Sequence, residues 1–142
     1  MNSRAGIADE LKLSAPDLGD AERAAVDRVL RQDQLTLGPE LSAFEEALAG
    51  WVGARHAVAV SSGTAALVLA LQACDLGPGD EVIVPSFTFP ATVNAVALVG
   101  AQPVIVDVDA ASWNLEVAAA AAAITPRTRA LLPVDLLSLI HI

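Results

Sequence analysis

The sequence predicts an α/β fold with three layers, in which a mostly parallel sheet is covered by helices on both faces. From residue 57 onward, short apolar runs alternate with stretches of helical character. The runs are apolar throughout, which is typical of strands that are buried on both sides. Turn sequences such as Gly77-Pro78-Gly79-Asp80 separate the two kinds of segment.

Two helices are expected before the alternating region. Residues 20–33 form the first, because Asp20 can cap it and an apolar stripe follows. The second begins at Pro39, which suits a first helical position, and Gly53 ends it. Residues 1–15 precede both helices as an N-terminal arm.

The alternating region supplies the predicted sheet and its covering helices. The expected strands are residues 56–61, 81–86, 103–109 and 129–134. The expected helices are residues 64–74, 90–100 and 115–123. Because a helix follows each of the first three strands, successive strands are expected to run parallel through right-handed crossovers.

Composition excludes several classes of partner. The formal net charge is −9, and eight scattered Lys and Arg residues offer no basic patch for nucleic acid or an anionic membrane. The longest uncharged stretch, between Glu81 and Asp107, is broken by three prolines, so no membrane-spanning helix is expected. The N-terminal residues lack the apolar run of a secretory signal. We therefore expect a soluble cytoplasmic protein.

Small polar residues, Ser61-Ser62-Gly63-Thr64, separate the first predicted strand from the helix that follows it. Open α/β sheets bind ligands at this edge. The first N–H groups of a helix are unpaired and carry partial positive charge, and Gly63 lets an anion approach them. The stretch thus indicates a phosphate or carboxylate cradle. The alternative is that Ser62 or Thr64 only caps the helix.

A second stretch of interest, Ser86-Phe87-Thr88-Phe89, follows the next predicted strand. An aromatic ring at the ligand edge of a sheet can stack on a planar group. Phe89 is the candidate for that role, whereas Phe87 is interpreted as a core residue.

Three motifs, in this order, resemble DegT/DnrJ/StrS-type aminotransferases: S-S-G-T-A-A-L, G-P-G-D-E-V-I-V-P and S-F-T-F-P-A-T. The resemblance covers roughly residues 14–136. It implies that residues 16–136 are the N-terminal part of the large domain of a fold-type I enzyme that uses pyridoxal 5′-phosphate (PLP). Such enzymes act mostly on nucleotide-linked keto sugars, here with glutamate as the expected amino-acid donor, and they form homodimers.

The resemblance also implies roles for individual residues. Gly63, Thr64 and Ala65 would help to hold the cofactor phosphate, and Phe89 would lie against the pyridine ring. The first and last of these assignments agree with what the residues themselves indicate, since a helix start suits a phosphate and an exposed aromatic suits a planar ring.

The remaining candidates for chemistry receive structural interpretations. Asp107 and Asp109 follow a predicted strand and are interpreted as turn or capping residues rather than as an acid–base pair. Cys74, the only cysteine, is interpreted as a buried spectator thiol. His56 and His141 have no partners at metal-ligand spacing, so no metal site is predicted.

The Schiff-base lysine of the resembled family has no counterpart in this chain, so no catalytic residue is assigned. The only lysine, Lys12, lies before the resemblance begins. Residues 137–142 are interpreted as a tail foreign to the family, on a truncated reading frame. We therefore expect a fragment that is inactive by itself.

Two other interpretations stay open. A sugar dehydratase of the same fold replaces the lysine with histidine, and the segment that would show this is absent from the chain. A non-catalytic phosphate-binding or interaction module would apply if 142 residues were the full length.

Overall fold

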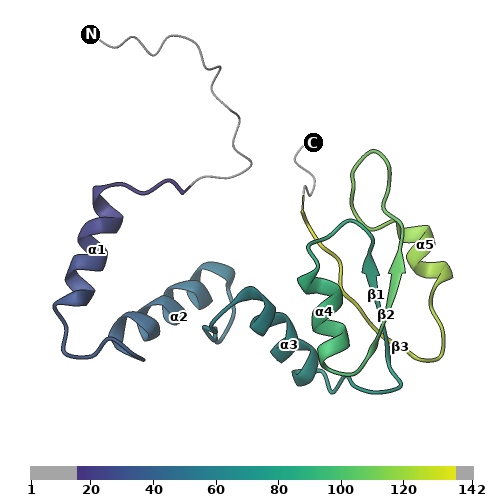
Figure 1. Cartoon of the computed structure of the whole chain (residues 1–142), viewed down its shortest axis with the longest axis horizontal. Coiled ribbons are helices and arrows are strands. Elements are labelled where there is room, and N and C mark those ends of the chain that lie inside the picture. The colour runs from purple at the N-terminus through teal and green to yellow at the C-terminus, as the bar shows by residue number, and fades with distance from the viewer. Residues whose placement is uncertain (1–15, 137–142) are drawn as a thin grey trace, which may run out of the picture. The chain divides into compact units, whose positions relative to one another are not determined.

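The computed structural model describes residues 16–136, which divide into two compact units at the boundary between Ala59 and Val60. The first unit holds helices α1 and α2, and the second holds the sheet and helices α3 to α5 (Figure 1). The predicted arm, with Lys12, and the predicted tail, with His141, lie outside the described residues.

Helix α1 (Asp20–Leu30) ends before the predicted residue 33 and has a different cap. Asp20 is its first residue, and Gly19 is the N-cap. The amide of Gly19 donates to the carboxylate of Glu22 at 2.7 Å, and this hydrogen bond lowers the pKa of Glu22. The acidic side chain that satisfies the helix start therefore comes from inside the first turn, as in a capping box.

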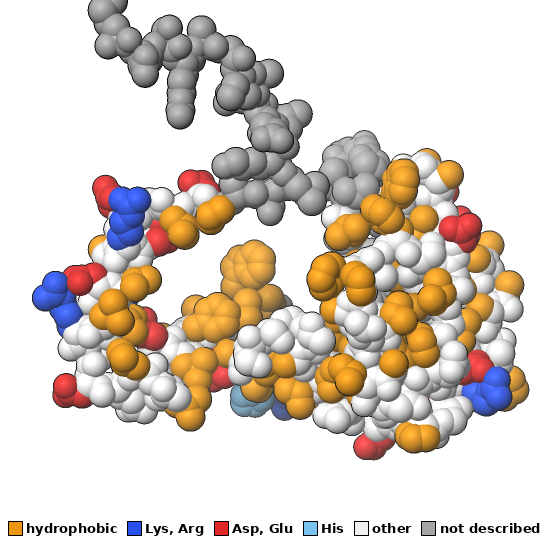
Figure 2. All heavy atoms as spheres, viewed as in Figure 1, with side chains coloured by type: hydrophobic (Ala, Val, Ile, Leu, Met, Phe, Trp, Pro, Cys, Tyr) orange, Lys and Arg blue, Asp and Glu red, His pale blue; other side chains and the backbone are white. Residues whose placement is uncertain are grey.

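Helix α2 (Pro39–Val52) has the predicted boundaries. Pro39 stands in its first turn, and Gly53 ends it in the left-handed conformation, with φ of 70°. Only a residue without a Cβ adopts this conformation at little cost. The apolar side chains of this unit are largely exposed, with Trp51 86% accessible, and Figure 2 shows hydrophobic side chains on the surface of both helices.

The second unit alternates helices and strands as predicted. Its elements are α3 (Gly63–Ala73), β1 (Glu81–Pro85), α4 (Ala91–Leu98), β2 (Gln102–Val106), α5 (Val117–Ala122) and β3 (Thr128–Leu131). The strands form a parallel sheet in the order β2-β1-β3, in which Ile83 is opposite Val104 on one side and Leu131 on the other. The predicted parallel α/β architecture is confirmed for these three strands.

The predicted strand at residues 56–61 is wrong. This segment has no regular secondary structure, and Val58 is 78% exposed. A strand exists only where a neighbouring backbone pairs with its amide and carbonyl groups. The strands of the described sheet pair only with one another, so the apolar alternation of this segment has no partner to turn it into a strand.

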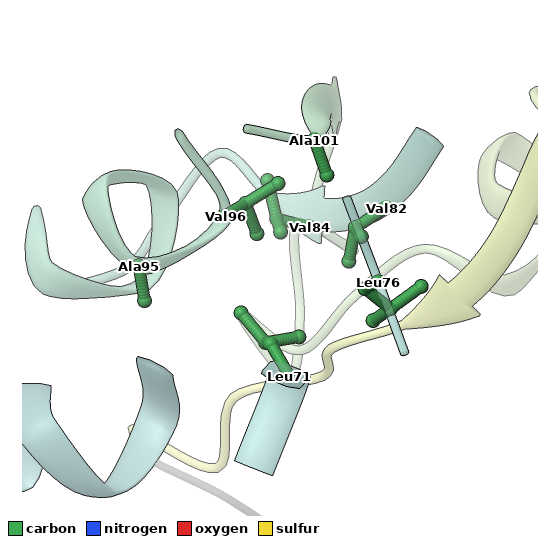
Figure 3. Packing of buried hydrophobic residues seen from close by; sticks show 7 residues of the cluster. All are labelled: Leu71, Leu76, Val82, Val84, Ala95, Val96 and Ala101. Carbon is green, nitrogen blue, oxygen red and sulfur yellow. The ribbon is translucent and has the colours of Figure 1, made fainter. Parts of the chain in front are cut away.

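The central strand β1 separates two hydrophobic clusters. Val82 and Val84 point to one face, where they pack with residues of α3, α4 and the connecting turns (Figure 3). The other members of that cluster are Leu71, Leu76, Ala95, Val96 and Ala101. Ile83 points to the opposite face and packs with Val106 and Ala120, the latter on α5. Helices therefore cover both faces, as the apolar strands predicted.

The prediction that Cys74 is buried is wrong. Helix α3 ends at Ala73, and Cys74 is its exposed C-cap. The apolar side of the helix end is formed by Leu71, which belongs to the core. Within residues 16–136, no helix has both the length and the apolar character needed to cross a membrane.

A buried carboxylate joins β1 to the start of β3, at the amino end of the sheet. Glu81 accepts hydrogen bonds from the hydroxyl of Thr125 and from the Arg127 guanidinium, whose Nε lies 2.9 Å away. The amide of Glu81 also donates to the carbonyl of Arg127 at 2.9 Å. The Thr125 hydrogen bond, with help from Arg127, holds the pKa of Glu81 below its ordinary value of 4.5.

The first prediction concerns acid stability. Because the folded pKa of Glu81 is lowered, its carboxylate stabilises the fold above pH 4.5, and this contribution is lost as the pH falls toward the folded pKa. We expect Glu81→Gln to be less stable than the wild type at neutral pH and to lose less stability on acidification. Urea unfolding at neutral pH and at a pH below 4.5 measures the stability of each protein under both conditions. Glu46→Gln, an exposed change on α2, is the control, and equal pH dependence in all three proteins would contradict the prediction.

The second prediction concerns association through the sheet edge. Strand β2 is an edge of the described sheet, and Ile105 on it is 57% exposed. Lysine on an edge strand opposes strand addition. We expect the wild type to associate and to bind a hydrophobic dye, and Ile105→Lys to lower association in light scattering.

Ile124→Lys is the matched control, because Ile124 is equally exposed, at 57%, but lies outside the strands. If both variants associate to the same degree, the edge is not the cause. A sharp wild-type monomer without dye binding would contradict the prediction as a whole.

Candidate functional site

An open hollow of about 480 Å³ lies at the start of helix α3. Six residues of α3, of α4 and of the loop before α4 line it: Gly63, Thr64, Leu67, Phe89, Ala91 and Thr92. Strand β1 ends at Pro85, just before that loop, so the hollow lies toward the carboxyl end of the strand. Ligands of open α/β sheets bind at this edge.

The start of α3 has one capped amide and others left for a ligand. Ser62 is the N-cap, and its hydroxyl accepts a hydrogen bond from the amide of Ala65 at 3.1 Å. The capping alternative is therefore correct for Ser62. The amides of Gly63 and Thr64 precede the first intrahelical donor, as in any α-helix, and carry partial positive charge. The cap at Ser62 does not exclude anion binding, because the cap uses the amide of Ala65 and leaves those of Gly63 and Thr64.

A second helix begins at the same hollow. The first residues of α4, Ala91 and Thr92, line it opposite the start of α3, and the two helices pack on each other. No Lys or Arg side chain lines the hollow. Arg127 is engaged with Glu81 at the other end of β1. With no basic side chain in its lining, the hollow can offer an anion only the partial positive charge of helix N-termini, which suits a phosphate or a carboxylate.

Gly63 keeps the approach to these amides open. A Cβ placed on this residue would meet no atom within 4 Å, so a side chain would extend into empty space beside the hollow. Among the described glycines, Gly63 is not one of those with positive φ. Glycine is therefore not needed for the backbone conformation, and what a side chain would remove is open space beside the hollow.

The structure brings together three of the four predicted binding residues. Gly63, Thr64 and Phe89 line one hollow, and the Phe89 ring is 72% exposed beside it. Ala65 is not among the lining residues, and its amide is bonded to Ser62. A role for Ala65 in binding stays a prediction.

Three lining residues were not singled out from the sequence: Leu67, Ala91 and Thr92. Thr92 is 6% exposed, and its hydroxyl lies 2.8 Å from that of Thr88. The sequence does carry a signal for Thr92, because it places a hydroxyl in the first turn of a helix that follows a predicted strand. Leu67 and Ala91 leave no such signal, because apolar residues on a helix are indistinguishable from core by sequence.

The turn role predicted for Asp109 is confirmed. Its Oδ1 accepts hydrogen bonds from the amides of Ser112 at 2.7 Å and Ala111 at 3.1 Å, and these bonds, that of Ser112 first, lower the pKa of Asp109. Asp107 accepts a bond from the amide of Val108 at 2.8 Å. Within residues 16–136, no three His, Cys, Asp or Glu side chains gather as a metal site requires.

Phe87 is half-buried rather than a member of either core cluster. Its ring packs on that of Trp113, with 4.9 Å between the centroids. Trp113 belongs to the connection between β2 and α5, so this contact links two loops.

Comparisons with known proteins agree with the fold. The model of the DegT/DnrJ/EryC1/StrS aminotransferase family matches residues 16–139. A UDP-2-acetamido-2-deoxy-3-oxo-D-glucuronate aminotransferase from Pseudomonas aeruginosa is 46% identical over 127 residues, which are 89% of this chain and 35% of the relative.

Solved structures of fold-type I aminotransferases resemble the chain in three dimensions. The crystal structure of 3-amino-5-hydroxybenzoic acid synthase has a TM-score of 0.81 and 49% identity, over 87% of this chain and 33% of that one. Spr1654 from Streptococcus pneumoniae, solved in PLP and PMP forms, has a TM-score of 0.84 and 37% identity, over 89% and 32%.

The chain thus spans about a third of the length of these relatives. It corresponds to part of a fold-type I domain, and the expected fold class is confirmed. Since the family model covers nearly all of the chain, this protein belongs to the DegT/DnrJ/EryC1/StrS aminotransferase family.

Proposed function

We propose that the chain is the N-terminal portion of the large domain of a PLP-dependent aminotransferase. The whole protein transfers an amino group from glutamate to a keto sugar carried on a nucleotide. The observation that carries the proposal is the hollow in which Gly63, Thr64 and Phe89 meet at the start of α3. The name of the Pseudomonas aeruginosa relative, which acts on a UDP-linked oxo sugar acid, supports the substrate class.

The residues of the hollow fit the phosphate and the ring of PLP. The amides of Gly63 and Thr64 and the Thr64 hydroxyl can donate to phosphate oxygens, and the absence of a Cβ at residue 63 leaves space for them. The exposed ring of Phe89 can cover the pyridine, and Leu67 adds an apolar surface. When bound, PLP supplies an electron sink that allows an amino group and a proton to be moved.

Ala65 belongs to the proposed cradle in a supporting position. Its amide, which donates to Ser62 at 3.1 Å, can reach a phosphate oxygen only by sharing or exchanging that bond. Binding of a phosphate would therefore change the hydrogen bond at the N-cap of α3 as well as the contacts in the hollow.

The 142-residue chain alone is proposed to be catalytically inactive. Transamination with PLP requires a lysine amine near the cofactor. Lys12 is the only lysine in the sequence, and it precedes the region that matches the family, residues 16–139. The described hollow contains no amine that could take its place.

We propose that the whole protein is a homodimer in the cytoplasm. We propose no nucleic-acid or membrane partner for it. The net charge of −9 supports the exclusion of polyanions. Exposed apolar side chains such as Leu98, 67% accessible, and Val117, 76% accessible, offer surface for further protein contacts.

The third prediction tests the phosphate cradle. We expect inorganic phosphate to bind with a Kd of about 1 mM. Thr64→Ala should weaken binding about fivefold, the usual effect of one lost hydrogen bond of about 1 kcal/mol. Gly63→Val should abolish binding without unfolding the chain, because its Cβ meets no protein atom. NMR titration of the amides measures all three affinities.

Gly50→Val is the matched control, since a Cβ on Gly50, in α2, also meets no atom within 4 Å. It should bind phosphate like the wild type. Unchanged binding in Gly63→Val would show that the residues only start a helix.

The fourth prediction tests the absence of a catalytic amine. After incubation with PLP and borohydride reduction, peptide mapping should find no stoichiometric adduct within residues 16–136. Weak labelling at Lys12 or at the α-amino group is expected of any accessible amine, and Lys12→Arg should remove the former. A single fully labelled residue in the sheet unit would overturn the proposed inactivity.

A further inference from the structure

The loop between β1 and α4 carries Phe89 into the hollow, and the side chains before Phe89 are all engaged elsewhere. The hydroxyl of Ser86 donates to Asp107 Oδ1 at 3.4 Å, toward the β2–α5 connection. The hydroxyl of Thr88 lies 2.8 Å from that of Thr92, on α4. Phe89 itself is 72% exposed. Its place at the hollow is therefore set by its neighbours rather than by its own burial.

Phe87 makes an aromatic contact with Trp113. Its ring centroid lies 4.9 Å from that of Trp113, and the two planes are inclined by 60°, which is a favourable arrangement for an aromatic pair. Thr88 thus anchors the loop to α4, and Phe87 anchors it to the β2–α5 connection. Anchors on two sides prevent the loop from turning about either one.

Trp113 stands in an unusual backbone conformation. Its φ is 61°, in the left-handed region that bulky residues rarely adopt. Its amide donates to the carbonyl of Asp109 at 2.8 Å, and the amide of Asp109 donates to the carbonyl of Asn114 at 2.9 Å. Such conformations persist only where the surroundings enforce them. Trp113 is still 46% exposed, so burial of the indole does not account for this arrangement.

We propose that Trp113 is a positioning residue for the aromatic wall of the cofactor site. Through its contact with Phe87, it holds the loop so that the ring of Phe89 faces the hollow beside Gly63 and Thr64. The proposal rests on the proposed function, because the ring that Phe89 covers is that of the cofactor. It assigns the β2–α5 connection, which does not line the hollow, to the selection of a planar ligand.

The test compares a ligand that has a ring with one that lacks it. Pyridoxine 5′-phosphate carries no aldehyde and cannot form an aldimine with Lys12, and inorganic phosphate, which has no ring, would contact only the start of α3. We expect Trp113→Ala to weaken the binding of pyridoxine 5′-phosphate about threefold to tenfold, the range for an aromatic pair. The binding of inorganic phosphate should stay unchanged. Trp113→Phe should restore most of the loss, and Trp51→Ala, in the first unit, should have no effect.

A second variant keeps the test informative if Trp113→Ala unfolds. Phe87→Leu removes the same ring contact from the other side and should reproduce the selective loss. Equal weakening of both ligands, or of neither, would overturn the positioning role. If the wild type binds phosphate and pyridoxine 5′-phosphate equally, or binds neither, the cofactor site of the proposed function fails instead.

A measurement without ligand tests the positioning role in that case. The chain has three phenylalanines, so 4-fluorophenylalanine labelling gives three ¹⁹F signals. Trp113→Ala should move the signals of Phe87 and Phe89 and leave that of Phe44, in the first unit, in place. A change at Phe87 with an unchanged Phe89 signal would overturn the proposal.

Discussion

The second unit depends on the complete burial of strand β1. Val82, Ile83 and Val84 have no exposed surface, and the strand pairs on both sides. A parallel strand in this position must be covered on both faces, because neither its side chains nor its backbone can meet water. The two hydrophobic clusters both start from this strand, with the valines on one face and the isoleucine on the other.

The same constraint creates the site. Helices α3 and α4 share one face of the sheet because Val82 and Val84 must be covered, and their packing brings both N-termini to one hollow. The chain leaves β1 at Pro85 and reaches the start of α4 through a short loop. The packing of the core therefore places Phe89 beside the hollow, and the contacts of the loop set only the direction of its ring.

An acidic chain can offer an anion site without basic side chains when the backbone supplies the potential. The net charge is −9, yet the hollow is lined by the starts of two helices and by no carboxylate. Arg127, one of the few cations, neutralises the buried Glu81 at the amino end of β1 instead. The carboxyl edge of the sheet is therefore left to backbone amides and hydroxyls, which suit a phosphate.

The sequence by itself determined the features that local chemistry controls. Pro39 and Gly53 bound α2 as predicted, because backbone preferences act within one turn. The three apolar runs after residue 80 are strands as predicted, and the central one, β1, is buried along its whole length. Gly63, Thr64 and Phe89 were expected to lie near one another, and they do line one hollow, although the segment before Gly63 is not a strand.

Only the tertiary structure decided the features that need a distant partner. Residues 56–61 carry an apolar pattern but form no strand, because no described backbone pairs with them. Cys74 was expected in an apolar helix but is its exposed C-cap, because the helix ends at Ala73 with another face toward the core. The packing of Phe87 on Trp113 joins two loops that are separated by a helix and a strand, and no periodicity within either loop encodes it. Such contacts arise only when the sheet brings the carboxyl ends of β1 and β2 together.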